Sequence, residues 1–272
     1  MIYETVRLTP FEEATLTALC ISNTPDLKQT PRRAVVVCPG GGYSKTSDRE
    51  AEPVVAQFLA AGFATFLLRY TCKEGAQNFA PLKQVALAIK HVRDNAARYN
   101  VDPDYVFTCG FSAGGHVAAS AGILWDRPEV RELMGDTPDG YWRPTGMILS
   151  YPVITGGEKA HKGSFYNLIG TTEPTEAQLD VYSLEKHVKP TTPPAFLWHT
   201  STDSSVPIYN SLYLATALAD ARVPFELHVF PEGRHGLSLA NEQTARTDPD
   251  LVVPHVQCWI DLAIRWAREL QI

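Results

Sequence analysis

Short runs of apolar residues recur along most of the chain, and each predicts a buried β-strand. Two segments near the N-terminus, "ETVRLT" (4–9) and "ATLTALCI" (14–21), instead alternate polar and apolar residues, as half-exposed antiparallel strands do. Mostly apolar runs are typical of strands covered on both faces of a parallel sheet. These runs lie at 32–39, 63–70, 105–110, 146–154, 195–200 and 225–230.

Segments with helical spacing separate these runs. The clearest, 81–98, starts with proline and repeats apolar residues along one helical face. Alternating strands and helices imply right-handed crossovers, and hence a mostly parallel, doubly wound sheet of about eight strands with flanking helices. The predicted helices cover 50–61, 81–98, 113–124, 207–221 and 254–269.

Two regions interrupt this alternation. Residues 125–145 are rich in Pro, Gly and Asp and predict a loop. Residues 155–194 follow the sixth strand and carry several aromatic residues, so we expect a small insertion or cap near the functional site. A plain surface loop is the alternative for both. The length favours one domain over 1–272.

Composition excludes some classes of partner. The chain has 272 residues and a net charge of −6, with no basic stripe, which argues against nucleic acid. No apolar stretch approaches 18 residues and no signal peptide is recognisable, so we expect a cytoplasmic protein that does not contact a membrane. The odd, scattered cysteines fit a reducing compartment; they are Cys20, Cys38, Cys72, Cys109 and Cys258.

The segment "VFTCGFSAGGHVAAS" (106–120) has the spacing G-x-S-x-G around Ser112. A strand precedes it and a helix follows, which is the context of a nucleophile elbow. Gly110 and Gly114 would remove the Cβ atoms that collide in so tight a turn. The helix N-terminus would favour a negatively charged oxygen. Because bare G-x-S-x-G also occurs by chance, the flanking pattern decides the interpretation.

A serine hydroxyl needs a base, and His235 is the best candidate among the eight histidines. It stands in a glycine-flanked loop just after the last predicted strand. His199 is the fallback, and His116, four residues after Ser112, either packs or braces the turn. The remaining candidates within predicted helices or strands are expected to be structural: His91, His228 and His255.

The imidazole needs an acid to hold its tautomer, and Asp203 follows the strand at 195–200. The chain order Ser112, Asp203, His235 is the order found in α/β-hydrolases. The alternative for Asp203 is an N-cap of the helix near 207.

Three glycines follow the strand at 32–39, in "VVVCPGGGYS". The amides of Gly41 and Gly42, with that of Ala113, would form an oxyanion hole. A phosphate loop is less favoured because the G-x-G-x-x-G and Walker spacings are missing. A simple turn is the remaining alternative.

Several motifs together resemble one family. "CPGGGYSKTSDREAEPVV", "GFSAGGHVAAS", "SYPVIT", "HTSTDSSVP" and "EGRHGLSLA" are similar to the acetyl-esterase and lipase-like branch of the α/β-hydrolases, which includes small bacterial carboxylesterases and carbohydrate acetyl or feruloyl esterases. The resemblance implies catalytic roles for Ser112, Asp203 and His235. It departs at Pro39, where many relatives have histidine, and Tyr43 is a candidate to position the loop instead.

The resemblance implies hydrolysis of short-chain acyl esters, acetyl above all, through an acyl-enzyme and without metal or cofactor. A small-molecule ester is the expected substrate, with acylated sugars as a candidate class, and self-association is common in the family. Tyr43, Phe165, Tyr166 and Tyr182 are candidates to line the pocket, although packing explains them equally well. An amidase or peptidase, or a hydrolase-like binding protein without catalysis, are the alternatives.

Overall fold

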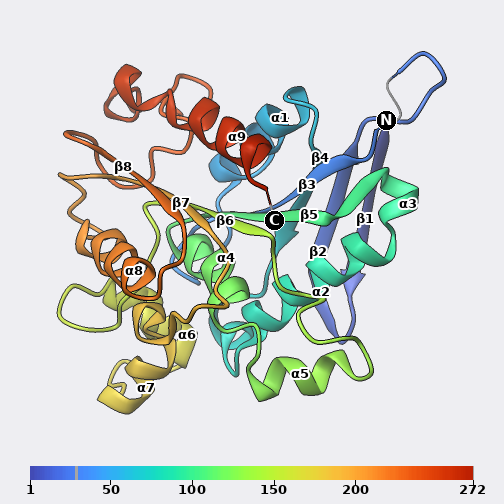
Figure 1. Cartoon of the computed structure of the whole chain (residues 1–272). Coiled ribbons are helices and arrows are strands. Elements are labelled where there is room, and N and C mark those ends of the chain that lie inside the picture. Colours follow the sequence, from blue (N-terminus) through green and yellow to red (C-terminus); the bar gives the residue numbers. More distant parts are fainter. Residues whose placement is uncertain (28–29, 272) are drawn as a thin grey trace.

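The computed structural model describes residues 1–27 and 30–271. Within those residues eight strands form one sheet in the order β1-β2-β4-β3-β5-β6-β7-β8 (Figure 1). The pairs β1–β2 and β2–β4 are antiparallel, and every other pair is parallel. The predicted mostly parallel sheet is therefore confirmed. Its strands are β1 (Ile2–Leu8), β2 (Phe11–Cys20), β3 (Arg32–Cys38), β4 (Ala64–Arg69), β5 (Val101–Phe111), β6 (Gly146–Ser150), β7 (Ala195–Thr200) and β8 (Phe225–Phe230).

Helices cover both faces of the sheet. Helices α1 and α9 lie on one face, and α2, α4 and α8 lie on the other (Figure 1). The residues of β3 alternate between two buried clusters: Val36 joins the cluster that contains α2 and α4, whereas Val37 joins the cluster that contains α1 and α9. Burial of both faces explains the continuous apolar runs. The helices are α1 (Glu52–Ala60), α2 (Ala80–Asp94), α3 (Ala96–Tyr99), α4 (Ala113–Ile123), α5 (Pro128–Met134), α6 (Lys162–Ile169), α7 (Glu176–Tyr182), α8 (Tyr209–Asp220) and α9 (Trp259–Glu269).

Some predicted bounds were wrong. The region 125–145, predicted as a loop, contains α5, which buries Val130 and Met134. Prolines and glycines on either side of this short helix hide its two apolar positions in the sequence. The helix predicted at 254–269 starts only at Trp259, after a 3-10 turn at Pro254–Val256.

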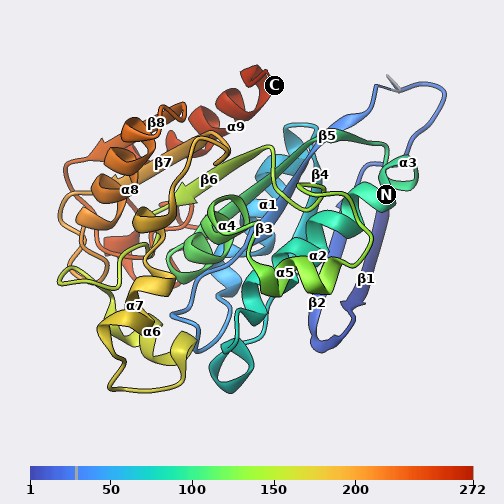
Figure 2. The ribbon, with the colours of Figure 1, turned by 60° about the horizontal axis from the view of Figure 1, so that its bottom comes forward.

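The insertion at 155–194 is folded into helices. It contains α6, α7 and a 3-10 helix (Leu184–His187), and α6 packs against another 3-10 helix, Lys73–Ala76. In Figure 2, α6 and α7 lie together on the side of the molecule away from α9. Within the described residues, no helix has both the length and the apolar character that crossing a membrane requires.

Candidate active site

Ser112 occupies a strained turn between β5 and α4. Its φ of 52° and ψ of −120° lie where residues with a side chain are rarely found. Two backbone hydrogen bonds hold the turn: its N–H donates to the Ser150 carbonyl (3.0 Å), and its carbonyl accepts from the Val153 N–H (3.0 Å). The end of β6 and the residues just after it therefore hold the serine backbone through both its N–H and its carbonyl.

The two glycines of the pattern are required by space. A Cβ on Gly110 would lie 2.1 Å from the Gly114 carbonyl oxygen, and a Cβ on Gly114 would lie 2.1 Å from the Cys38 carbonyl oxygen. Both contacts are to backbone atoms, which cannot move aside without shifting a strand or a helix. The G-x-S-x-G spacing thus follows from the close approach of β5, α4 and the end of β3.

The structure brings Ser112, Asp203 and His235 together. Nε2 of His235 lies 2.8 Å from Oγ of Ser112, and Nδ1 lies 2.6 Å from Oδ2 of Asp203. Because a carboxylate only accepts hydrogen bonds, Nδ1 carries the proton and Nε2 is the acceptor facing the hydroxyl. The three residues come from loops after β5, β7 and β8, at the carboxyl edge of the sheet.

Asp203 is held as an ionised acceptor. Its side chain is fully buried, and Oδ1 accepts from the backbone amides of Ser205 and Val206, both at 2.9 Å. Burial on its own would raise the pKa of Asp203, but contacts with His199 and His235 and the Val206 amide hold that pKa well below its usual range. The carboxylate can therefore stabilise a positive charge on the imidazole of His235.

His199, the fallback base, braces the loop of the acid instead. It is fully buried, with Nδ1 2.8 Å from the Ser211 hydroxyl and Nε2 2.9 Å from the Val206 carbonyl oxygen. Its Nε2 also lies 3.4 Å from Oδ2 of Asp203, so both ring nitrogens of His199 have partners other than Ser112.

The loop that carries His235 is held by Arg49, which sequence reasoning missed. The Arg49 guanidinium donates to the carbonyl oxygens of Gly236 (2.8 Å) and Thr244, and the Ser238 hydroxyl donates to the Arg49 carbonyl (2.6 Å). The basic residue in "SDREAEP" was a weak signal, because nothing in the pattern links it to residues 187 positions away.

The glycine loop, residues 39–43, lies against Ser112. A Cβ on Gly40 would lie 2.9 Å from the Ser112 Cβ. Gly41 and Gly42 have φ values of 134° and 65°, which favour glycine. Within the described residues, no acceptor takes a hydrogen bond from the amides of Gly41, Gly42 or Ala113. Unpaired amides beside a nucleophile can stabilise an anionic oxygen.

Buried polar side chains bond this loop from the protein interior. Oε2 of Glu50 accepts from the Gly40 amide (2.9 Å), and Oε1 accepts from the Tyr151 hydroxyl (2.7 Å). The Tyr70 hydroxyl donates to the Pro39 carbonyl (2.6 Å). Glu50 is only 4% exposed, so the Gly40 amide and the Tyr151 hydroxyl take the place of water as its hydrogen-bond donors.

Tyr43 and His116 form a second support. The Tyr43 hydroxyl lies 2.7 Å from Nδ1 of His116, and Nε2 of His116 lies 2.8 Å from the Tyr182 carbonyl oxygen. Burial lowers the pKa of His116 from 6.5 to about 4, so the ring is neutral at pH 7. Nε2–H then donates to Tyr182 and Nδ1 accepts from Tyr43.

Two of the residues predicted to line the pocket are buried in the interior instead. Tyr43 and Phe165 are each 1% exposed, and Phe165 packs edge-on against His116, so both support the site from the interior. Tyr182 packs against Phe79, with the two rings tilted by 32°. Tyr166 is half-buried and lines a hollow of about 550 Å³ with Lys73, Glu74, Gln77, Asn167 and the residues that directly follow α6.

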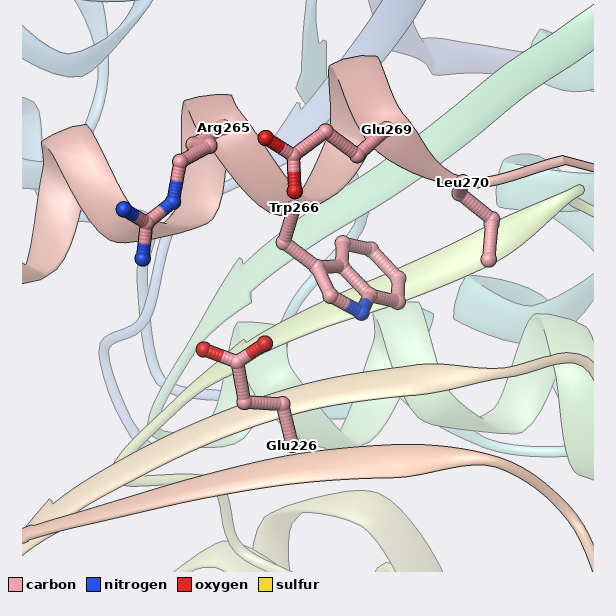
Figure 3. Close-up of a pocket in the computed structure, with 5 residues that line it drawn as sticks. All are labelled: Glu226, Arg265, Trp266, Glu269 and Leu270. Atoms are coloured by element: carbon pink, nitrogen blue, oxygen red, sulfur yellow. The ribbon is translucent and has the colours of Figure 1, made fainter.

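Another hollow, of about 360 Å³, lies between β8 and α9 (Figure 3). Glu226 lines it near the start of β8, opposite Trp266 and Arg265 of α9. Because β5 to β8 run parallel, the start of β8 lies at the opposite edge of the sheet from Ser112. This hollow is therefore separate from the serine, histidine and aspartate.

Residues 23–218 match the family model described as BD-FAE. This match spans well over half of the chain. The chain belongs to the BD-FAE family. Its sheet and its structural neighbours make this BD-FAE member an esterase-like α/β-hydrolase.

Solved structures resemble the BD-FAE chain over nearly its whole length. An acetyl ester-xyloside bifunctional hydrolase from Caldicellulosiruptor lactoaceticus is 37% identical, with a TM-score of 0.80 over 96% of this chain and 89% of that chain. A carboxylesterase from Lactobacillus plantarum is 31% identical, with a TM-score of 0.85 over 99% and 98%.

Curated relatives of the BD-FAE chain are longer. An endo-1,4-beta-xylanase B of Butyrivibrio fibrisolvens is 40% identical over 78% of this chain and 33% of its own length. An acetylxylan esterase of Xylanibacter ruminicola is 32% identical over 75% of this chain and 41% of its own length. The chain thus spans less than half the length of either relative.

Proposed function

We propose that this chain is a carboxylic ester hydrolase in which Ser112 is the nucleophile. The observation that carries the proposal is the line of contacts from Ser112 Oγ to His235 Nε2 (2.8 Å) and from His235 Nδ1 to Asp203 Oδ2 (2.6 Å). A hydroxyl paired with a neutral imidazole nitrogen, itself oriented by a carboxylate, is the arrangement that activates serine for acyl transfer.

In the first half-reaction, Ser112 Oγ attacks the ester carbonyl carbon while its proton moves to His235 Nε2. The carbonyl oxygen becomes negative and accepts from the amides of Gly41, Gly42 and Ala113, each of which contributes about 3 kcal/mol in comparable sites. His235 then gives the proton to the departing alcohol oxygen. In the second half-reaction, water attacks the acyl carbon as it loses a proton to His235, and His235 returns that proton to Ser112 Oγ as the bond to the acid breaks.

The substrate class that we propose is a short acyl ester, acetyl above all, on a carbohydrate. Two relatives carry names that include acetylxylan esterase and acetyl ester-xyloside hydrolase, and both share the sheet or the sequence over most of this chain. We also treat residues 1–272 as one hydrolase domain, in which 155–194 is a small cap beside Ser112.

The test compares turnover of p-nitrophenyl acetate by wild type and Ser112→Ala. We expect kcat/KM to fall by at least about a thousandfold, because the nucleophile is lost. The control is Ser120→Ala: Ser120 lies on the same helix, is buried and only bonds the Val117 carbonyl, so activity should stay near wild type. Equal turnover by Ser112→Ala would exclude Ser112. A preference for octanoyl over acetyl esters would contradict the short-acyl class.

A further inference from the structure

His161 lies at the start of α6, in the insertion, and its ring faces the glycine loop. A Cβ on Gly42 would lie 3.9 Å from Cε1 of His161. Burial lowers the pKa of His161 below its usual value, so the ring is neutral at pH 7.

The hydrogen bonds of His161 assign its tautomer. Its Nδ1 accepts from the Ser164 amide (3.3 Å) and lies 2.8 Å from the Ser164 hydroxyl. The ring proton must then be on Nε2. Within the described residues nothing accepts from this Nε2–H. The Nε2 atom is also not fully buried, so it is open to solvent. His161 thus presents a neutral, unpaired donor beside the site.

This step rests on the proposed function. In an ester bound at Ser112, few oxygens remain free to accept a hydrogen bond from His161. The carbonyl oxygen is taken by the three amides and the leaving oxygen by His235, and an acetyl methyl has no acceptor. The remaining acceptors of an acylated sugar are the oxygens of its alcohol part. Farther along the same helix, Tyr166 and Asn167 line a hollow whose other side chains include Lys73, Glu74 and Gln77.

We propose that Nε2–H of His161 donates a hydrogen bond to a sugar oxygen next to the ester and so selects carbohydrate esters over esters of simple alcohols. A site built to bond a substrate oxygen discriminates against analogues without that oxygen, because its own polar group then stays unpaired.

A pair of substitutions separates the two nitrogens of His161. In His161→Asn, the amide oxygen takes the place of Nδ1 and still caps α6, but no donor reaches the place of Nε2. In His161→Gln, the amide nitrogen reaches the place of Nε2, whereas the cap is lost. The two variants therefore separate recognition from helix stability, with melting temperature as the check on folding.

We expect His161→Asn to lower kcat/KM on acetylated xylo-oligosaccharide by about tenfold or more, the size of one lost hydrogen bond. Its kcat/KM on p-nitrophenyl acetate, which has no sugar oxygen, should change by less than about threefold. His161→Gln should keep most activity on the sugar ester despite a lower melting temperature. His187→Phe, a control in the same insertion whose Nε2 bonds the Asp180 carbonyl, should leave the ratio of the two substrates unchanged.

Other results would overturn the proposal. An equal loss of both activities in His161→Asn would mean that His161 only supports the glycine loop. Unchanged activity on the sugar ester, or a His161→Gln variant no better than His161→Asn, would mean that no such bond forms. Failure of the proposed function looks different: Ser112→Ala would then retain the turnover of p-nitrophenyl acetate.

Discussion

The serine turn and the glycine loop lie side by side, but different forces hold them. The turn at Ser112 is fixed by backbone packing: Gly110 and Gly114 leave no space for a Cβ. The glycine loop is crowded too, since a Cβ on Gly40 or Gly41 would meet the carbonyl oxygen of Phe111 or Lys45, but side chains from distant segments also bond it. Glu50 bonds its amide at Gly40, and Tyr70 bonds its carbonyl at Pro39.

This difference affects how substitutions change the stability of the protein and how that stability depends on pH. Backbone packing tolerates no added atom but contains no titratable group. A network of side chains tolerates small changes one contact at a time, and it includes a buried carboxylate and a neutral histidine. We therefore expect substitutions in the turn to act on folding as a whole, and substitutions around the loop to act in steps on stability and kcat.

The largest effect should come from Gly114→Ala. The added Cβ would lie 2.1 and 2.3 Å from the carbonyl oxygens of Cys38 and Pro39, so the start of α4 must move away from β3. We expect the free energy of unfolding to fall by about 3 kcal/mol or more, with loss of activity. Urea unfolding measures this. Gly157→Ala, where a Cβ would meet only Thr155 Oγ1 at 3.4 Å, should cost far less; equal losses would refute the packing argument.

Next comes Glu50→Ala. It leaves the Gly40 amide and the Tyr151 hydroxyl without their acceptor, which should cost about 2 to 3 kcal/mol and lower kcat at least tenfold. Glu50→Gln keeps the shape and one acceptor and should recover part of both. Glu52→Ala is the control, since that exposed carboxylate only meets Arg69 at 3.5 Å. Similar kcat values in all three variants would show that the loop does not need Glu50.

The same contrast explains what could be predicted from the sequence. The turn was predictable because its signal in the sequence is local: a strand, two glycines around Ser112 and a helix within a few residues. The parallel sheet followed from its apolar runs for a similar reason. The short helix α5 was missed because only two of its side chains are buried, among prolines and glycines.

The supports of the glycine loop could not be predicted. Glu50 and Tyr151 are 101 residues apart, and no spacing rule links a charged residue in a polar segment to a tyrosine at the end of β6. His161 was one histidine among eight until the fold placed it beside Gly42. Contacts between polar side chains from separate loops leave no such local signal in the sequence, because they form only in the finished fold.

The third prediction uses the titration of His116. The unfolded chain takes up a proton near pH 6.5, but the folded protein does so only near pH 4, so this group contributes stability above pH 6.5 that is lost as the pH falls towards 4. Between pH 7 and pH 5 the loss should be about 2 kcal/mol. His116→Gln can accept from Tyr43 and donate to Tyr182 without titrating, so urea unfolding should show a correspondingly weaker pH dependence. An identical pH dependence in both proteins would mean that His116 is not held neutral by burial.

The smallest effect, and the sharpest test of the side-chain network, is Tyr43→Phe. The substitution removes only the hydroxyl that bonds His116 and keeps the ring packed under the loop, so it should cost about 1 kcal/mol. Tyr99→Phe is the matched control: this buried tyrosine donates to Glu4 at 2.6 Å, away from Ser112, and should lose similar stability with unchanged kinetics. If Tyr43 positions the amides of Gly41 and Gly42, kcat on p-nitrophenyl acetate should fall severalfold at nearly constant KM, because misplaced amides weaken the transition state more than the bound ester. An unchanged kcat would mean that Glu50 and Tyr70 hold the loop without the Tyr43 hydroxyl. The loop would then depend on few contacts, as the turn does.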